Sequence, residues 1–229
     1  MATAFQTQIP IPGSDPVSAI INVPDPCPNP LQWAFIIAHG AGNDMNTPML
    51  EYLAEGLAHA GHLAMRFNFP YRDQGKKSPD PQKKLEATWL AAFEFLKNHP
   101  EYRAEKIVAA GKSMGGRVAA QLAAKNVLLA DRLIFYGYPL HAPGKTDKLN
   151  DAHLYDIQVP MLFFAGTRDA LCDLDKLKGV ISRMQGAASL EIVEGGDHSF
   201  KVPKNLGMRQ AEVYQWILEK TMQQDKRTP

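Results

Sequence analysis

A serine set between glycines, in the segment Gly111–Gly115 (GKSMG), is the part of the sequence best suited to chemistry. The apolar run at 107–110 precedes it, and an alanine-rich stretch follows. This order predicts a strand, a sharp turn that exposes the Ser113 Oγ, and a helix, which together form a nucleophile elbow. The glycines are expected because a Cβ would obstruct the close return of the helix to its strand. Ser113 is therefore the candidate nucleophile.

The same residues also resemble the end of a phosphate-binding P-loop. That motif requires a glycine five residues before Gly111, and Lys106 stands there instead. The residues between them are typical of a strand and not of a glycine-rich loop. The sequence therefore disfavours a nucleotide-binding site at this turn.

A hydroxyl nucleophile needs a base, and the base needs a carboxylate to orient it. In α/β-hydrolases, the acid and then the histidine follow the serine along the chain. After Ser113, one apolar run leads to Asp169, and the next leads to two glycines, Asp197 and His198. The ends of parallel strands meet at one edge of a sheet, so we expect these side chains to face a common crevice. Ser113, Asp169 and His198 are the predicted catalytic residues.

Other acids and histidines fit these roles less well. Asp173 and Asp175 lie where a helix is predicted to begin, and carboxylates there commonly serve as N-caps. Asp197 is expected to shape the histidine loop. His141 and His153 precede the predicted acid, which the chain order disfavours.

A second glycine-rich turn, HGAGND at residues 39–44, follows the apolar run 33–38. We predict that the backbone N–H groups of Ala41 and Met114 form an oxyanion hole. Gly40 and Gly42 let the backbone approach a ligand closely, so both are predicted to bind substrate. The first residue of this turn, His39, is expected to orient the loop by hydrogen bonding.

A metal site built from His39, Asp44 and His198 is the alternative interpretation. No pair of candidate ligands has a helical spacing such as H-x-x-x-H. We therefore expect neither a metal nor another cofactor.

Apolar runs alternate with amphipathic segments along the chain. Strands are predicted at 17–23, 33–38, 62–69, 107–110, 132–137, 160–166 and 190–193, and helices at 49–60, 81–97, 114–125, 173–184 and 205–222. Such alternation implies a mostly parallel central sheet with right-handed crossovers and helices on both faces. The expected class is α/β, with an α/β-hydrolase fold and one domain over residues 1–229. The stretch 138–159 is too short for a large lid domain.

The polar segment at 70–80 is predicted to be a surface loop that borders the site. Its Arg72 is assigned to substrate binding. Five basic residues near the expected strand ends favour a substrate that carries a carboxylate: Arg66, Arg72, Lys76, Lys112 and Arg117.

The composition narrows the class of protein further. The net charge of +1 on 229 residues gives no reason to expect nucleic acid or an anionic membrane as a partner. No run approaches transmembrane length, and the first residues lack the basic start and apolar stretch of a secretion signal. Cys27 and Cys172 are thus expected to be free thiols in the reducing cytoplasm. The oligomeric state is not readable from the sequence.

Six blocks carry a resemblance to a known family: residues 39–45 (HGAGNDM), 66–71 (RFNFPY), 111–117 (GKSMGGR), 138–141 (YPLH), 166–169 (GTRD) and 195–200 (GGDHSF). Together they resemble the α/β-hydrolase-like proteins grouped with testis-expressed protein 30 and the hydrolase-like subunit of a histone acetyltransferase complex. They are more distantly similar to dienelactone hydrolases. The resemblance spans about residues 15–220. It implies the α/β-hydrolase fold with Ser113, Asp169 and His198 at the triad positions.

The sequence thus predicts a serine hydrolase that cleaves a small-molecule ester or thioester through an acyl-enzyme. Peptide cleavage remains open, because the same groups cleave amides. The alternative is a non-catalytic module of the same fold that binds a ligand or partner. Retention of all three triad residue types favours the enzyme.

Overall fold

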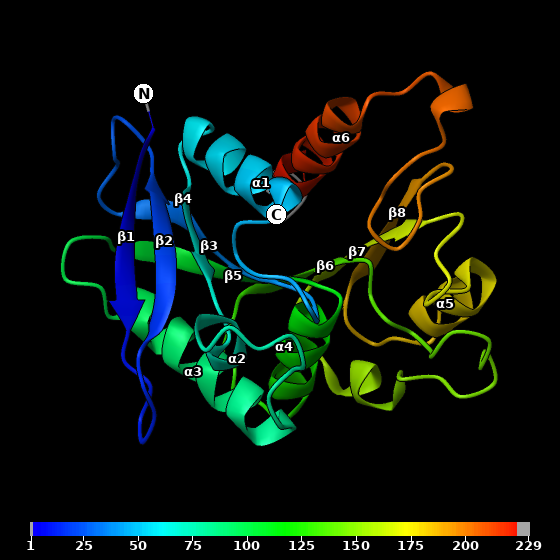
Figure 1. Ribbon diagram of the computed structural model, residues 1–229, viewed down its shortest axis with the longest axis horizontal. Helices are drawn as coiled ribbons and strands as arrows, with labels where there is room; N and C mark the ends of the chain where they lie inside the picture. Colours follow the sequence, from blue (N-terminus) through cyan, green and yellow to red (C-terminus); the bar gives the residue numbers. More distant parts are fainter. Residues whose placement is uncertain (1, 224–229) are drawn as a thin grey trace.

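One eight-stranded sheet organises the protein (Figure 1). The computed structural model describes residues 2–223. The strands are β1 (Thr3–Ile9), β2 (Val17–Val23), β3 (Leu31–Ala38), β4 (Leu63–Phe67), β5 (Ala104–Lys112), β6 (Arg132–Tyr136), β7 (Met161–Gly166) and β8 (Ala188–Val193). Their spatial order is β1-β2-β4-β3-β5-β6-β7-β8.

Strand register brings the functional loops to one edge of this sheet. From β4 to β8 all neighbouring strands are parallel, and Ala38 of β3 pairs with Gly111 of β5. Further along, Gly166 of β7 pairs with Val193 of β8. The residues that follow these strands therefore emerge side by side, at the carboxyl edge where open α/β sheets bind ligands.

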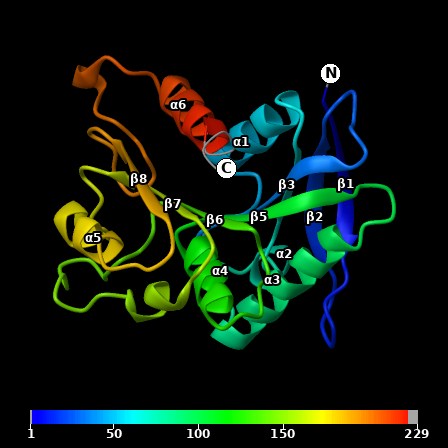
Figure 2. The same cartoon turned by 180° about the vertical axis from the view of Figure 1, so that it is seen from behind.

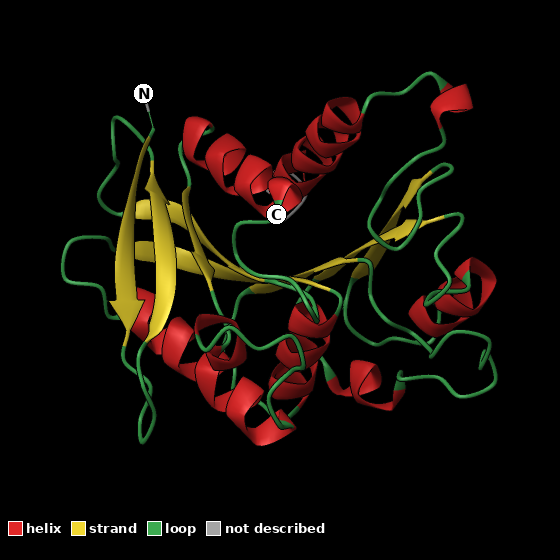
Figure 3. Cartoon of the chain, viewed as in Figure 1, coloured by secondary structure: helices red, strands yellow, loops and turns green. Residues whose placement is uncertain are grey.

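Helices cover both faces of the sheet, as Figures 2 and 3 show. The helices are α1 (Pro48–His59), α2 (Pro70–Asp73), α3 (Gln82–Lys97), α4 (Met114–Ala124), α5 (Leu174–Ile181) and α6 (Gln210–Gln223), with the 3₁₀ turns η1 (Ala152–Asp156) and η2 (Lys204–Leu206). The apolar side chains of α1 and α6 pack on one face, and those of α3, α4 and α5 pack on the other.

The central strands are apolar on both sides because both sides are covered. In β3, Ala34 and Ile36 belong to the core under α3 and α4, whereas Phe35 and Ile37 belong to the core under α1 and α6. A strand buried on both faces reads as a continuous apolar run instead of an alternating one. This explains why the runs were visible in the sequence, and the predicted α/β class with a mostly parallel sheet and helices on both faces is confirmed.

Three details of the predicted architecture are wrong. The sequence interpretation missed β1, whose outer residues are polar because it lies at the edge and pairs only with β2, in an antiparallel hairpin. The segment 70–80 begins with α2, where Pro70 stands in the first turn, a position that suits its fixed φ. The last helix starts at Gln210 and not at residue 205, because Gly207 adopts a left-handed φ of 68° that ends η2.

The connection between β6 and β7 contains η1 and loops, and no lid domain stands there. Within residues 2–223, no helix combines the length and apolar character needed to span a bilayer. Cys27 is an exposed free thiol and Cys172 a buried one.

The β5–α4 turn yields a first prediction, tested with a matched pair of helical glycines. A Cβ on Gly115 would stand 2.7 Å from the His39 carbonyl oxygen, whereas a Cβ on Gly179 in α5 would meet no atom within 4 Å. Gly115→Ala should lower the unfolding free energy by about 1–3 kcal/mol through overpacking. Gly179→Ala should raise it by up to about 1 kcal/mol, because alanine favours a helix. Urea unfolding measures both, and equal effects would contradict the proposed close approach.

Candidate active site

Ser113 occupies a strained turn between β5 and α4. Its φ of 49° and ψ of −112° lie in a region that a residue with a Cβ rarely adopts. The strain is maintained by the packing around it, since Gly115 lies against β3 and the Trp89 indole N–H donates to the Gly115 carbonyl at 2.9 Å. The turn lifts the serine hydroxyl out of the sheet, and the helix that follows points its free N–H groups toward the same space.

Ser113, His198 and Asp169 form a continuous hydrogen-bonded chain. The His198 Nδ1 lies 2.8 and 2.9 Å from the two Asp169 carboxylate oxygens, and its Nε2 lies 2.8 Å from the Ser113 Oγ. An ionised carboxylate only accepts, so Nδ1 carries the proton and Nε2 is free to accept from the serine hydroxyl. The arrangement can transfer the Ser113 proton to His198 during attack on an acyl carbon.

Asp169 and His198 differ in how far their side chains are buried. The Asp169 side chain is fully buried, whereas the His198 side chain keeps 24% of its surface exposed. A backbone N–H from Leu171 also donates to Asp169 at 2.8 Å. The carboxylate is thus held in one orientation, while the imidazole remains reachable from solvent.

Contacts between the loops after β7 and β8 hold Asp169 and His198 in register. The Thr167 hydroxyl accepts from the Gly195 N–H at 2.7 Å, and the Arg168 N–H donates to the Gly196 carbonyl at 2.9 Å. Asp197 accepts from two backbone N–H groups of its own loop, as expected for a residue that shapes it. The sequence interpretation missed Thr167, because nothing in its own neighbourhood indicates a partner 28 residues away.

The competing acids and histidines have other partners. Asp173 caps α5 by accepting from the Lys176 N–H at 3.0 Å. His141 Nε2 accepts from the Asp173 N–H at 2.9 Å, and His153 Nε2 lies 2.8 Å from the Tyr138 hydroxyl. These bonds serve loop structure, in agreement with the chain-order argument.

The glycine-rich turn after β3 lies against the serine. A Cβ on Gly40 would stand 3.5 Å from the Ser113 Cβ, so the backbone of this turn borders the reacting hydroxyl. Gly42 adopts a positive φ of 73°, which glycine tolerates without strain. Ala41 lies between these two glycines.

His39 fixes the orientation of this turn. Its Nε2 accepts from the Phe69 N–H at 3.1 Å, so Nδ1 carries the proton and donates to the Gly40 carbonyl at 2.8 Å. The Tyr71 hydroxyl reaches the same carbonyl at 3.4 Å. In a planar trans peptide, the Ala41 N–H points opposite to the Gly40 carbonyl, so holding the carbonyl also sets the direction of that N–H.

Comparison with known proteins identifies the fold family. Residues 32–225 match the family described as alpha/beta hydrolase domain. The chain belongs to this family.

Solved structures of several hydrolases share the fold of this alpha/beta hydrolase. A dienelactone hydrolase from Anabaena variabilis ATCC 29413 is 19% identical with a TM-score of 0.72, covering 97% of this chain and 98% of its own. A structure described as an alpha-beta serine hydrolase homologue from Coxiella burnetii is 20% identical with a TM-score of 0.73, covering 94% and 96%. A serine hydrolase without lid from Xanthomonas campestris is 21% identical with a TM-score of 0.67, covering 94% of both chains.

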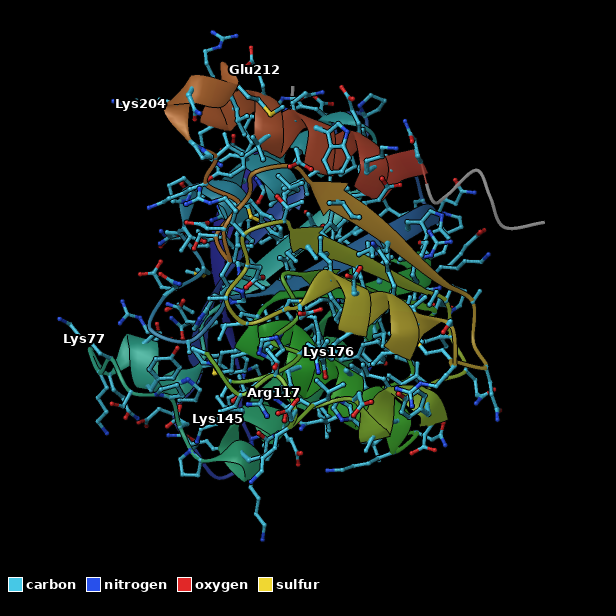
Figure 4. The ribbon with its side chains drawn as sticks, turned by 90° about the vertical axis from the view of Figure 1, so that its right-hand side faces the viewer. Lys77, Arg117, Lys145, Lys176, Lys204 and Glu212 are labelled. Carbon is cyan, nitrogen blue, oxygen red and sulfur yellow. The ribbon has the colours of Figure 1, made fainter. Side chains whose placement is uncertain are left out.

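The basic residues near the strand ends of the hydrolase differ in their surroundings. Arg66 is buried and pairs with Glu51 at 3.5 Å, and Arg72 pairs with Asp44 at 3.3 Å. Their charges are therefore partly neutralised by the chain itself. The basic side chains labelled in Figure 4 are spread over that side of the molecule and do not gather at one point.

The residues of the alternative metal interpretation have other partners. His39 uses both ring nitrogens for the backbone, and Asp44 faces Arg72. Among residues 2–223, no group of three or more His, Cys, Asp or Glu side chains is arranged to hold a metal ion.

The titration of His39 yields a second prediction. Burial lowers the pKa of His39 from 6.5 to about 4, so the folded hydrolase keeps this ring neutral where the unfolded chain protonates it. The unfolded state therefore binds more protons between these values, and stability should fall as pH drops from about 6.5 to about 4, by roughly 3 kcal/mol.

His39→Gln removes this titration while retaining an acceptor for the Phe69 N–H. The variant should be less stable than the wild type at pH 7, and the gap should narrow as the pH falls toward 4. Urea unfolding across this pH range measures the gap. A gap that stays constant with pH would exclude His39 as the titrating group.

Proposed function

We propose that this protein is a serine hydrolase that cleaves a small ester or thioester. Ser113 attacks the acyl carbon while His198 takes its proton, and Asp169 orients the ring and stabilises the imidazolium. The tetrahedral intermediate collapses as His198 gives the proton to the departing alcohol or thiol. Water, deprotonated by His198, then attacks the acyl-serine, and the acid product leaves with Ser113 restored.

The observation that carries this proposal is the hydrogen-bonded series Ser113–His198–Asp169. The Ser113 Oγ lies 2.8 Å from the His198 Nε2, and the Asp169 carboxylate oxygens lie 2.8 and 2.9 Å from the His198 Nδ1. Three residues from separate strand ends converge with the donor and acceptor pattern that nucleophilic catalysis requires. Membership of the alpha/beta hydrolase family and neighbours described as serine hydrolases support the same reaction class.

The oxyanion would be stabilised by the N–H groups of Ala41 and Met114. Two features support this assignment: Met114 is the first residue of α4, and the Gly40 carbonyl is held by His39. N–H groups at the start of a helix lack intrahelical acceptors and favour negative charge. Such donors lower the barrier by stabilising charge that develops only in the transition state.

Substrate contacts are proposed at Gly40, Gly42 and Arg72. The two glycines leave the backbone open beside Ser113, and Arg72 lies on α2, which follows the neighbouring strand β4. A small substrate suits a site without a covering domain. One fold neighbour, Est1E from Butyrivibrio proteoclasticus, has been solved with ferulic acid bound, which is consistent with small aromatic acids among the candidate products.

The proposed chemistry needs no cofactor, because serine, histidine and aspartate supply the nucleophile, the base and the charge. We also propose a cytoplasmic location and a small-molecule substrate, with neither nucleic acid nor membrane as a partner. The two free cysteines support the location, since thiols persist in reducing compartments.

The third prediction compares three substitutions. Ser113→Ala should abolish labelling by a fluorophosphonate reagent, which reacts only with an activated serine. Asp169→Asn should lower kcat toward short esters by roughly 10⁴, because the histidine loses the correct tautomer. Asp173→Asn is the matched control: it makes the same chemical change four residues away, and asparagine caps a helix as well as aspartate does. Its kcat should stay near that of the wild type.

Labelling and steady-state kinetics with a panel of esters and thioesters decide between enzyme and binding module. Folded wild type that neither labels nor turns over any member of the panel would contradict the proposed function. The non-catalytic alternative would then be favoured, with the Ser113–His198–Asp169 geometry present but without a reaction.

A further inference from the structure

A hollow of about 440 Å³ lies where β1 and β2, which form one flank of the sheet in Figure 1, meet the loops after β3 and β4. Its volume falls in the range of about 300–1,000 Å³ that is typical of small-molecule sites. Ala19 and Met45 supply its apolar surface, and the remaining lining is polar: Gln6, Thr7, Gln8, Ser18, Asn46 and Asn68. None of these lining residues carries a charge.

Strand register gathers the amide side chains on one face of the sheet. Gln8 of β1 pairs with Ser18 of β2, and Gln6 pairs with Ile20. Residues directly opposite one another share a face, and so do residues two apart along a strand. The side chains of Gln6, Gln8 and Ser18 therefore lie on the same side of the β1–β2 hairpin.

The loop after β3 borders the hollow on the side of the proposed active site. Arg66 of β4 donates from Nη1 to the Met45 carbonyl at 2.8 Å and to the Asn46 Oδ1 at 3.2 Å. The Asn68 Oδ1 accepts from the Met45 N–H at 2.9 Å. These residues continue the turn that carries Ala41, the proposed oxyanion donor. The end of β4 is two strands from the end of β5, about 10 Å away, so a substrate larger than a simple alkyl ester reaches both places.

Most of the polar groups in the hollow have no partner within the protein. Among residues 2–223, the side chains of Gln6, Thr7 and Gln8 form no hydrogen bond, and neither does the Ser18 hydroxyl. Edge strands commonly use charged side chains to prevent pairing with other chains, but β1 has no charged residue. Neutral donors and acceptors thus meet in one space at the carboxyl edge of the sheet.

The charged side chains nearest the hollow are engaged elsewhere. Arg66 pairs with Glu51 at 3.5 Å, and Arg72 pairs with Asp44 at 3.3 Å. Asp73 accepts from the backbone of β2 and from the amide after β4, at 2.6 and 2.8 Å. A charged ligand would lose its hydration here without meeting an opposite charge, and an apolar ligand would leave the amides without partners. Hydroxyl groups both donate and accept, as amides do, so the lining suits a neutral group rich in hydroxyls.

We propose that this hollow binds a neutral polyhydroxylated group, such as a sugar residue, that forms the alcohol part of the substrate ester. Ser113 attacks the acyl carbon of this ester, and the departing polyol takes its proton from His198. The inference rests on the proposed function for the bond that is cleaved. Binding of the free polyol does not depend on catalysis, so the two can be tested separately.

Titration of the ¹⁵N-labelled full chain with cellobiose measures binding without turnover. The side-chain amide signals of Gln6 and Gln8 are assigned by their loss in Gln6→Ala and Gln8→Ala. Cellobiose should shift these signals with a Kd on the order of 1 mM, because neutral hydrogen bonds in an open site contribute little each. Cyclohexanol and sodium succinate, matched for ionic strength, are the apolar and anionic comparisons and should leave the signals in place.

Kinetics test whether the hollow acts on the substrate. The wild type should show a kcat/KM for cellobiose monoacetate above that for ethyl acetate, with the difference in KM. The double variant Gln8→Ala/Ser18→Ala should lower the ratio of the two kcat/KM values roughly tenfold, because two hydrogen-bonding groups are lost. Gln32→Ala is the matched control: it removes an exposed amide at the opposite, amino end of β3 and should keep the wild-type ratio.

The outcomes distinguish this inference from the proposed function. Amide signals that do not respond to cellobiose, or respond equally to succinate or cyclohexanol, overturn the inference even if the wild type is an active esterase. A preference for the sugar ester that persists in Gln8→Ala/Ser18→Ala also overturns it, since the sugar is then bound elsewhere. Cellobiose binding at these amides in a protein that neither labels nor turns over ester supports the binding site and contradicts the proposed reaction.

Discussion

The close approach of α4 to the end of β5 is the constraint on which the rest of the site depends. Because Gly115 packs against the backbone of β3, the chain must turn from strand to helix within a single residue, and Ser113 takes the strain. That turn sets the height of the hydroxyl above the sheet. It also aligns the start of a helix with the turn after β3, so one local restriction positions the nucleophile and both proposed oxyanion donors.

The parallel register of the strands brings the other two residues of the triad to the same edge of the sheet as Ser113. Asp169 and His198 follow β7 and β8, and the Ser113 turn follows β5, so β6 alone separates the nucleophile from its partners. Gly137 stands at the end of β6 and leaves room across that gap. The spacing of the strands therefore makes a hydrogen bond of 2.8 Å possible between residues 85 positions apart.

Electrostatics divides the histidines of the site into different roles. His39 is enclosed and bonded to backbone at both nitrogens, so burial keeps it neutral and it serves as a structural support. His198 is partly exposed and contacts the buried Asp169 carboxylate on one side and the Ser113 hydroxyl on the other. The same side chain thus becomes a support or a candidate base according to the charges and solvent around it.

Local patterns in the sequence determined the strands buried on both faces, the nucleophile turn and the chain order of serine, acid and histidine. They did so because continuous apolar runs and glycines at tight turns are local requirements of the fold. The helix cap role of Asp173 was also predictable, since capping involves neighbours in sequence. The edge strand β1 was not, because its polar outer residues are tolerated only through pairing with β2.

Only the tertiary structure decided which side chains share an environment. Nothing near Arg72 in the sequence reveals that Asp44 neutralises part of its charge. Likewise, the contact between Thr167 and Gly195 arises from the alignment of two loops. Residue type and spacing determine the local turns, whereas burial and charge pairing depend on strand register and on what each loop packs against.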